Sequence, residues 1–272
     1  MSDEEPLVAR AHETLVGWLA LGHESTAHPL ARIVRDARTP IVYDANFAAE
    51  VRARTPDEIE ALLAEVDCAF AGLGHRHFYW DPGMPQPFET RLLLDGYSAG
   101  TGDVILVLEG ELRARGPRVE LRAVESDADW AVLEALHRLD HEEEAAKGFH
   151  RPWQPEVTRQ LVLAKRAKAP AVRYVLARAD GVDCAFFSAW PGENGVGKVE
   201  DLFTRSDFRG RGIATALIAA CVDDARARGA GPVLIGARGG DTPKHMYKAL
   251  GFRPLCVERN YVRTDLLEAQ TS

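Results

Sequence analysis

The residues with the clearest chemical potential form a short glycine-rich loop at residues 209–214, Arg-Gly-Arg-Gly-Ile-Ala, predicted between a strand and a helix. The first N–H groups of a helix have no partners inside it and carry partial positive charge, so they bind anions. Gly210 and Gly212 lack a Cβ and would let the backbone approach a phosphate closely. Arg205 and the two loop arginines add three positive charges. Since the loop has neither the third glycine of a Rossmann fingerprint nor the Gly-Lys-Ser/Thr of a P-loop, it predicts a different kind of pyrophosphate site.

A second group of reactive side chains lies at residues 140–153, which begin Asp-His-Glu-Glu-Glu. His137 and His141 are one helical turn apart, a spacing that zinc ligands can have. A charged run of this kind is more typical of a solvated face, and we predict no metal site. The carboxylates, together with the rings of Phe149 and Trp153, would suit a cationic ligand.

The elements that position these groups follow from hydrophobic periodicity and from capping and turn residues. They predict an α/β fold of the α+β type, a mixed sheet with helices on its faces, in the order β-α-α-β-β-β-α-β-α-β. The predicted strands are 119–124, 172–179, 182–190, 199–204, 232–237 and closing strands within 252–264. The predicted helices start at Ser126 or Asp127, at Pro155, at Ile213 and at Pro243, and the last two end at Gly229 and Gly251.

The first half resembles a degenerate copy of the second. Gly74 and Gly229, and likewise Gly96 and Gly251, are 155 residues apart, and two predicted helices and a strand match at the same offset. We therefore predict a duplicated fold with domains 1–115 and 116–272. At the same offset Asp57 stands where the second half has the second loop glycine, and its carboxylate would repel a pyrophosphate. The N-terminal domain is predicted to lack a working loop and to frame an acceptor site or stabilise the fold.

The glycine loop after a strand, followed by Tyr-Lys-Ala-Leu-Gly-Phe at residues 247–252, resembles the GCN5-related N-acetyltransferases (GNAT). The similarity covers residues 119–264 and includes the helix start at 241–247. The motifs at 43–46, 72–76 and 95–97 make the whole chain similar to two-domain bacterial members with a divergent N-terminal half. This resemblance implies tandem GNAT-like acyl-CoA acyltransferase folds, the C-terminal one complete and the N-terminal one degenerate.

The resemblance also implies acetyl-CoA as co-substrate, with no metal, and an amine of a small molecule or peptide as acceptor. The N–H groups of residues 211–215 would hold the pyrophosphate, and residues 202–204 would pair with the pantetheine arm like an added strand. An N–H near Leu202 or Phe203 would polarise the thioester carbonyl. Tyr247 would protonate the leaving thiolate, the alternative being a packing role. The residues so assigned to the cofactor are Leu202, Phe203, Thr204, Arg209, Gly210, Arg211, Gly212, Ile213, Ala214, Thr215, Lys244 and Tyr247.

Direct attack by an amine also needs a base, because the amine is protonated at pH 7. Glu200 and Asp201 are adjacent on the strand that leads to the loop, and strand alternation points them to opposite faces. One of them would face the acceptor, directly or through water, and we favour Glu200. The alternative is that one caps a backbone group or pairs with an arginine.

The composition limits the remaining function classes. The chain has 272 residues, a net charge of -8 and a pI near 5.6, which argues against nucleic acid as a partner. An acidic N-terminus and short apolar runs predict neither a signal peptide nor a membrane span, and so a cytoplasmic protein. We expect it to be a monomer or a homodimer. The four scattered cysteines are predicted to be small buried residues. Alternatives to amine acetylation are transfer to another nucleophile and sensing of acyl-CoA without turnover.

Overall fold

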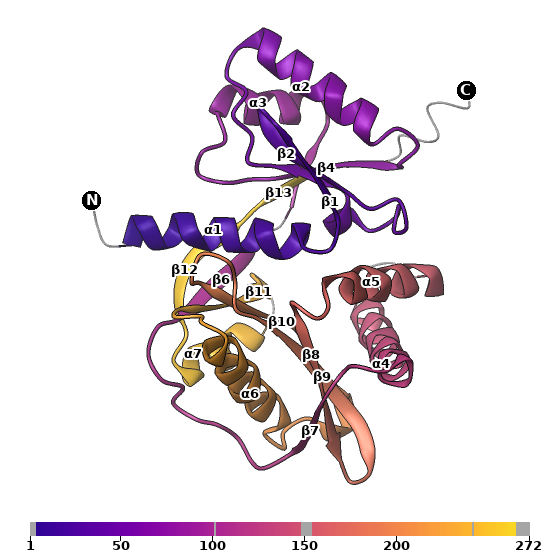
Figure 1. Ribbon diagram of the computed structural model, residues 1–272, viewed down its shortest axis with the longest axis vertical. Coiled ribbons are helices and arrows are strands. Elements are labelled where there is room, and N and C mark those ends of the chain that lie inside the picture. Colours follow the sequence, from indigo (N-terminus) through magenta and orange to yellow (C-terminus); the bar gives the residue numbers. More distant parts are fainter. Residues whose placement is uncertain (1–3, 101, 148–153, 241, 265–272) are drawn as a thin grey trace. The chain divides into compact units, whose positions relative to one another are not determined.

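The chain builds two mixed β-sheets, shown in the computed structural model in Figure 1. The structure describes residues 4–100, 102–147, 154–240 and 242–264. They fall into two units: the first takes the described residues of Met1–Val104, Arg238–Gly240 and Cys256–Ser272, and the second those of Ile105–Ala237 and Asp241–Leu255. The division of the chain between residues 115 and 116 into domains stays a prediction.

The sheet of the first unit has six strands in the order β1-β2-β3-β4-β13-β5. Only β3 and β4 pair in parallel; the other neighbours are antiparallel. Phe70 of the segment after α2, Phe78 of β4 and Phe88 of α3 are fully buried in the core of this unit. Its strands are β1 (Glu24–His28), β2 (Ala31–Arg35), β3 (Phe47–Ala49), β4 (His75–Tyr79), β5 (Ser98–Ala99) and β13 (Asn260–Thr264), and its helices are α1 (Glu4–Ala20), η1 (Tyr43–Ala45), α2 (Pro56–Ala69) and α3 (Gln86–Leu94).

The second sheet has seven strands in the order β12-β6-β11-β10-β9-β8-β7. The strands β7 to β10 pair as antiparallel neighbours, and β10 pairs with β11 in parallel. The element order predicted from the sequence for this half is confirmed. The strands are β6 (Asp103–Leu108), β7 (Glu120–Ala123), β8 (Arg173–Ala179), β9 (Val182–Trp190), β10 (Gly197–Thr204), β11 (Val233–Arg238) and β12 (Arg253–Glu258); the helices are α4 (Asp127–Ala146), α5 (Pro155–Lys168), η2 (Ser206–Phe208), α6 (Ile213–Ala227) and α7 (Pro243–Leu250).

The last strand of the chain lies in the first sheet. Here β13 pairs along its whole length with β4 and also with β5. Both closing strands were expected in the C-terminal half, and for β13 this expectation is wrong. A strand sequence specifies which face is apolar, but the sheet edge that receives it is decided by long-range pairing.

Three local predictions are also corrected. Residues 140–146 were predicted as a polar segment after a helix, but α4 continues through them to Ala146. The positive-φ glycine that follows α2 is Gly72, with φ 82°, rather than Gly74. Gly96 and Gly251 both have positive φ, as expected of glycines that end helices. Cys184 and Cys221 are buried as predicted, whereas Cys68 is exposed on the outer face of α2.

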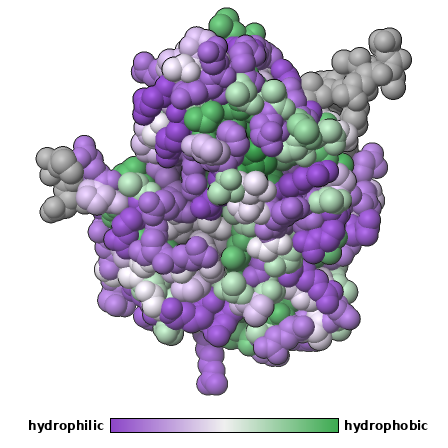
Figure 2. All heavy atoms as spheres, turned by 45° about the horizontal axis from the view of Figure 1, so that its top comes forward, coloured by the Kyte–Doolittle hydropathy of each residue, from purple (hydrophilic) through white to green (hydrophobic). Residues whose placement is uncertain are grey.

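The molecular face in Figure 2 is covered mainly by hydrophilic side chains, with hydrophobic ones in small groups. The large apolar side chains that are exposed come from several elements, Leu93 and Leu94 of α3 being the most exposed. Within the described part of the chain, every helix is too short or too polar to cross a bilayer.

Candidate active site

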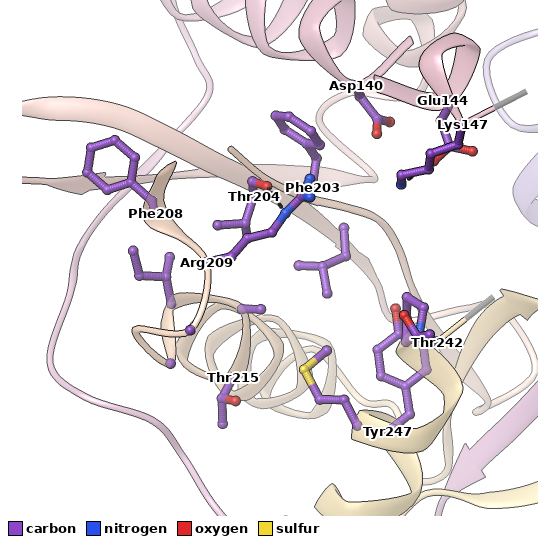
Figure 3. A pocket seen from close by; sticks show the side chains of 17 residues that line it. Asp140, Glu144, Lys147, Phe203, Thr204, Phe208, Arg209, Thr215, Thr242 and Tyr247 are labelled. Atoms are coloured by element: carbon purple, nitrogen blue, oxygen red, sulfur yellow. Dashed lines mark hydrogen bonds and ion pairs between the residues drawn. The ribbon is translucent and has the colours of Figure 1, made fainter. Parts of the chain in front are cut away.

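A cavity of about 530 Å³ opens beside the glycine loop in the second unit (Figure 3). Its walls come from the end of β10, the loop, the first turn of α6, the start of α7 and the last turns of α4. Ten of the predicted cofactor residues line it, all except Arg211 and Lys244. The lining residues that sequence analysis did not assign to the cofactor are Asp140, Glu144, Lys147, Phe208, Thr242, Pro243 and Met246.

The first turn of α6 has N–H groups that no side chain caps. The N-cap residue is Gly212, in the left-handed region at φ 75°, and Gly210 has the same φ. A Cβ at Gly212 would stand 2.7 Å from Cδ of Pro117, whereas one at Gly210 would meet nothing within 4 Å. A glycine is therefore needed at the two positions for different reasons. At 212 it lets Gly116-Pro117 pack on the loop, and at 210 it leaves the loop surface open.

The corresponding helix of the first unit, α2, begins in the opposite way. Thr55 accepts a hydrogen bond from the N–H of Glu58, and the Glu58 carboxylate accepts hydrogen bonds from the N–H groups of Arg54 and Thr55. This capping box occupies the helix N-terminus with the chain's own oxygens and places a carboxylate there. At the start of α2 an anion would compete with the Thr55 and Glu58 oxygens for the N–H groups and would be repelled by the Glu58 carboxylate. The start of α6 has neither obstacle.

The end of β10 separates from β11. Their parallel pairing covers only Gly197–Val199 against Val233–Ile235, although β10 continues to Thr204. A β-bulge between Glu200 and Phe203, with Asp201 at φ 69°, redirects the strand there. The backbone of residues 202–204 consequently faces the cavity on the side where β11 would otherwise pair. The Thr204 hydroxyl oxygen is buried and has no hydrogen-bond partner within the described residues.

The arginines around the loop are ion-paired rather than free. Arg205 contacts Asp207 at 2.9 Å, and Arg211 contacts Asp180 at 2.6 Å. Arg209 donates to the carbonyl of Thr204 at 2.8 Å and pairs with Glu143 of α4. The three positive charges predicted around the loop are thus each neutralised by a carboxylate: Arg209 joins the loop to β10 and α4, while the anion site itself rests on backbone N–H groups.

Tyr247 of α7 lies in the wall opposite α4, with only 4% of its surface exposed. Its ring packs 6.2 Å from that of Phe252. Helix α7 begins with Pro243 and ends at Gly251, which fixes the turn on which the tyrosine lies. The phenol end of this side chain is thus held at the cavity by a packed ring.

The two predicted bases do not line the cavity. Glu200 contacts Lys198 at 2.8 Å, and its oxygens approach Gly236 of β11. Asp201, in the bulge, contacts Lys165 of α5 at 2.6 Å. Burial alone would raise the pKa of Asp201, but the charge and hydrogen bond of Lys165 outweigh it, so the pKa lies below its usual value. Both carboxylates are engaged with lysines, and their role as bases stays a prediction.

Asp140 and Glu144 are the two carboxylates of α4 that line the cavity (Figure 3), and Glu144 contacts Lys147 at 3.0 Å. Burial, together with the negative charges of Glu144, Asp201 and Glu143, raises the pKa of Asp140 to about 7, against a smaller opposite effect of Lys147. At neutral pH this carboxyl is therefore present in both its protonated and its ionised form. In the sequence, residues 140–144 are recognisable only as an acidic run. Which of these carboxylates is buried depends on what packs against the helix.

The two histidines of α4 are buried in packing contacts. His137 stacks on Phe186 with ring centroids 4.4 Å apart, and His141 lies 2.8 Å from the hydroxyl of Thr158. A search of the described residues finds no group of three or more His, Cys, Asp or Glu that would hold a metal ion. Phe149 and Trp153, predicted to face a cationic ligand, lie outside the described residues.

Comparisons with known proteins agree with this geometry. Residues 133–252 match the model of the acetyltransferase (GNAT) family. No curated protein sequence matches the chain.

Solved structures match along its length. A GCN5-related N-acetyltransferase from Kribbella flavida is 18% identical, with 98% of this chain and 99% of that chain covered and a TM-score of 0.66. A functionally unknown conserved protein from Staphylococcus epidermidis is 14% identical (90% and 95% covered, TM-score 0.65). A tandem GNAT protein from the clavulanic acid biosynthesis pathway is 14% identical (96% and 93% covered, TM-score 0.59). At these identities the likeness is one of fold.

Proposed function

We propose that the protein moves the acetyl group of acetyl-CoA to an amine, because residues 133–252 match the acetyltransferase (GNAT) family and the chain is similar in fold to a tandem GNAT protein. The observation that carries the proposal is the cavity beside the glycine loop of the second unit. It joins an uncapped helix N-terminus, an unpaired strand edge and a buried tyrosine. We place the reaction in the cytoplasm.

The pyrophosphate of the donor would bind at the first turn of α6. The N–H groups of residues 211–215 are offered by a helix that starts at a glycine without a side-chain cap. Aligned N–H groups and the helix dipole together stabilise a multiply charged anion. The capped and acidic start of α2 supports assigning donor binding to the second unit alone.

The pantetheine arm would add to the free edge of β10 at residues 202–204. Main-chain pairing supplies hydrogen bonds to the amide groups of the arm without demanding a particular side chain. The buried Thr204 hydroxyl, unpartnered within the described residues, would gain a partner from the same arm. An N–H at Leu202 or Phe203 would then stabilise the negative charge that develops on the thioester oxygen.

Tyr247 would act as general acid. Expulsion of CoA leaves an electron pair on sulfur, and a phenol held at the cavity can protonate it. The position of Tyr247 on a short helix, packed by Phe252, would keep the hydroxyl in place during this step.

The experiment measures thiol release from acetyl-CoA with a panel of amines, and acetyl-CoA affinity by calorimetry. We expect one or more amines to raise thiol release far above hydrolysis. Tyr247→Phe should lower kcat by about 10²-fold, within the usual range for general acids, and leave the affinity for acetyl-CoA within about twofold. Tyr43→Phe, a change at an exposed tyrosine of the first unit, serves as control. Tight acetyl-CoA binding without thiol release for any acceptor would contradict the proposal and indicate an acyl-CoA-binding protein.

A further inference from the structure

Two carboxylates of α4, Asp140 and Glu144, lie on the wall that faces the phenol of Tyr247, and Glu144 is paired with Lys147 at 3.0 Å. Asp140 comes from α4 and Tyr247 from α7, and the end of β10 with Phe203 and Thr204 lies between them (Figure 3). An acetyl group carried along β10 would therefore have Asp140 on one side and Tyr247 on the other. This arrangement separates a proton acceptor from a proton donor around a single reacting carbon.

The two carboxylates on β10 itself, Glu200 and Asp201, are arranged differently. Glu200 is bound to Lys198, and Asp201 to Lys165, and neither contributes to the cavity wall. The charge and hydrogen bond of Lys165 hold the pKa of Asp201 below its usual value, which makes Asp201 a weaker base than a carboxylate surrounded by other negative charges. The strand thus supplies backbone groups to the site, whereas the carboxylates of the cavity wall come from the helix.

We infer that Asp140 is the catalytic base that removes a proton from an alkylammonium acceptor, an inference that rests on the proposed function and deepens it. The assignment moves the base from β10, where the sequence predicted it, to α4. It also names the acceptor class: an amine that is protonated at neutral pH and is drawn to a negatively charged wall.

The surroundings of Asp140 support this role. Burial and neighbouring negative charge raise the pKa of Asp140 to about 7, and a base is most effective when its pKa lies near the working pH. The charged groups around it are Glu143, Glu144 and Lys147 on α4, Asp201 on β10 with its partner Lys165 on α5, and Arg209 of the loop, which pairs with Glu143. The three neighbouring carboxylates are each paired with one of these cations, so the net negative charge that an incoming ammonium group would meet is that of ionised Asp140.

The proton transfers balance as follows. The Asp140 carboxylate takes one proton from the ammonium group, and the freed lone pair forms the C–N bond at the thioester carbonyl. Collapse of the tetrahedral intermediate breaks the C–S bond, and the thiolate takes the proton of the Tyr247 hydroxyl. The second proton on nitrogen restores Tyr247, and Asp140 loses its proton to solvent. The products are the acetylated amine, CoA and one released proton.

The test compares the pH dependence of kcat/KM for wild type and Asp140→Asn, with the alkylamine that gives the fastest thiol release. For wild type we expect kcat/KM to rise to a plateau with a midpoint near pH 7. For the variant we expect a loss of about 10²- to 10⁴-fold at pH 7 and a steady rise toward the pKa of the amine itself. Formate should restore part of the activity of Asp140→Ala, because the small carboxylate can occupy the vacated space.

Two controls keep this test separate from that of the proposed function. Glu142→Gln removes an exposed charge from the same helix and should leave the pH profile unchanged. The acetyl-CoA affinity of Asp140→Asn should stay within about twofold of wild type. An Asp140→Asn profile with the wild-type midpoint, or loss of that midpoint in Glu200→Gln instead, would overturn the inference. Failure of wild type with every amine would refute the proposed function instead.

Discussion

Replacing Asp140 by Asn should stabilise the protein, and only at high pH. Each pKa unit corresponds to about 1.4 kcal/mol, so the difference between about 7 and the usual 3.8 sets an upper limit of about 4 kcal/mol. Asp140 is partly exposed, and solvent screening reduces such effects, so we expect about 2 kcal/mol. Between pH 4 and pH 7 the folded protein holds a proton that the unfolded chain has lost. Wild-type stability at this site therefore falls as pH rises through that window and is constant above it.

The assay is thermal unfolding of wild type and Asp140→Asn at pH 4 and pH 8.5. We expect similar Tm values at pH 4 and a variant Tm about 5 °C higher at pH 8.5, since about 1 kcal/mol corresponds to roughly 2–4 °C for units of this size. Glu142→Gln is the matched control, with the same Tm difference from wild type at both pH values. If the Tm difference between Asp140→Asn and wild type were the same at both pH values, Asp140 would titrate normally and the described environment would be incorrect.

Three further outcomes follow from the packing. Lys165→Met leaves the half-buried Asp201 without its cation and should cost about 3 kcal/mol, measured by urea unfolding. The double variant with Asp201→Asn should recover most of this loss, and an equal loss in both variants would argue against the ion pair. Gly212→Ala should destabilise the protein by about 1–3 kcal/mol more than Gly210→Ala, because only the first methyl meets Pro117; equal Tm values would contradict this. Burial, and next the neighbouring charge of His77, lowers the pKa of His75 to about 4, so stability present above pH 6.5 is lost as pH falls toward 4. His75→Phe should reduce this loss, measured as the difference between the free energies of urea unfolding at pH 7.5 and pH 5. An unchanged difference would refute the prediction.

Local sequence signals predicted most of the second unit. The cap at Ser126, Pro155 in the first turn of α5 and the glycine stops at Gly229 and Gly251 each act over a few residues, so they can be recognised without the fold. The glycine loop belongs to the same class, because its conformation and the helix that follows it are adjacent in the chain.

Features that depend on distant partners could not be predicted in this way. Strand β13 belongs to the first sheet because it pairs with β4, whose residues come about 180 positions earlier in the chain. The pairing of Arg209 with Glu143, and the burial of Asp140, depend on how α4 packs near β10. Residue types in an acidic run do not show which carboxylate is enclosed, and so the sequence directed attention to Glu200 and Asp201.

The assignment of donor binding to α6 is tested most directly by amide hydrogen exchange with and without saturating acetyl-CoA. Exchange at residues 211–215 should slow by about tenfold or more, because the pyrophosphate would accept hydrogen bonds from these N–H groups. Exchange at residues 57–59 of α2, whose N-terminus is already capped, should not change and serves as an internal control. Unchanged exchange at residues 211–215, or protection at residues 57–59 instead, would contradict the account.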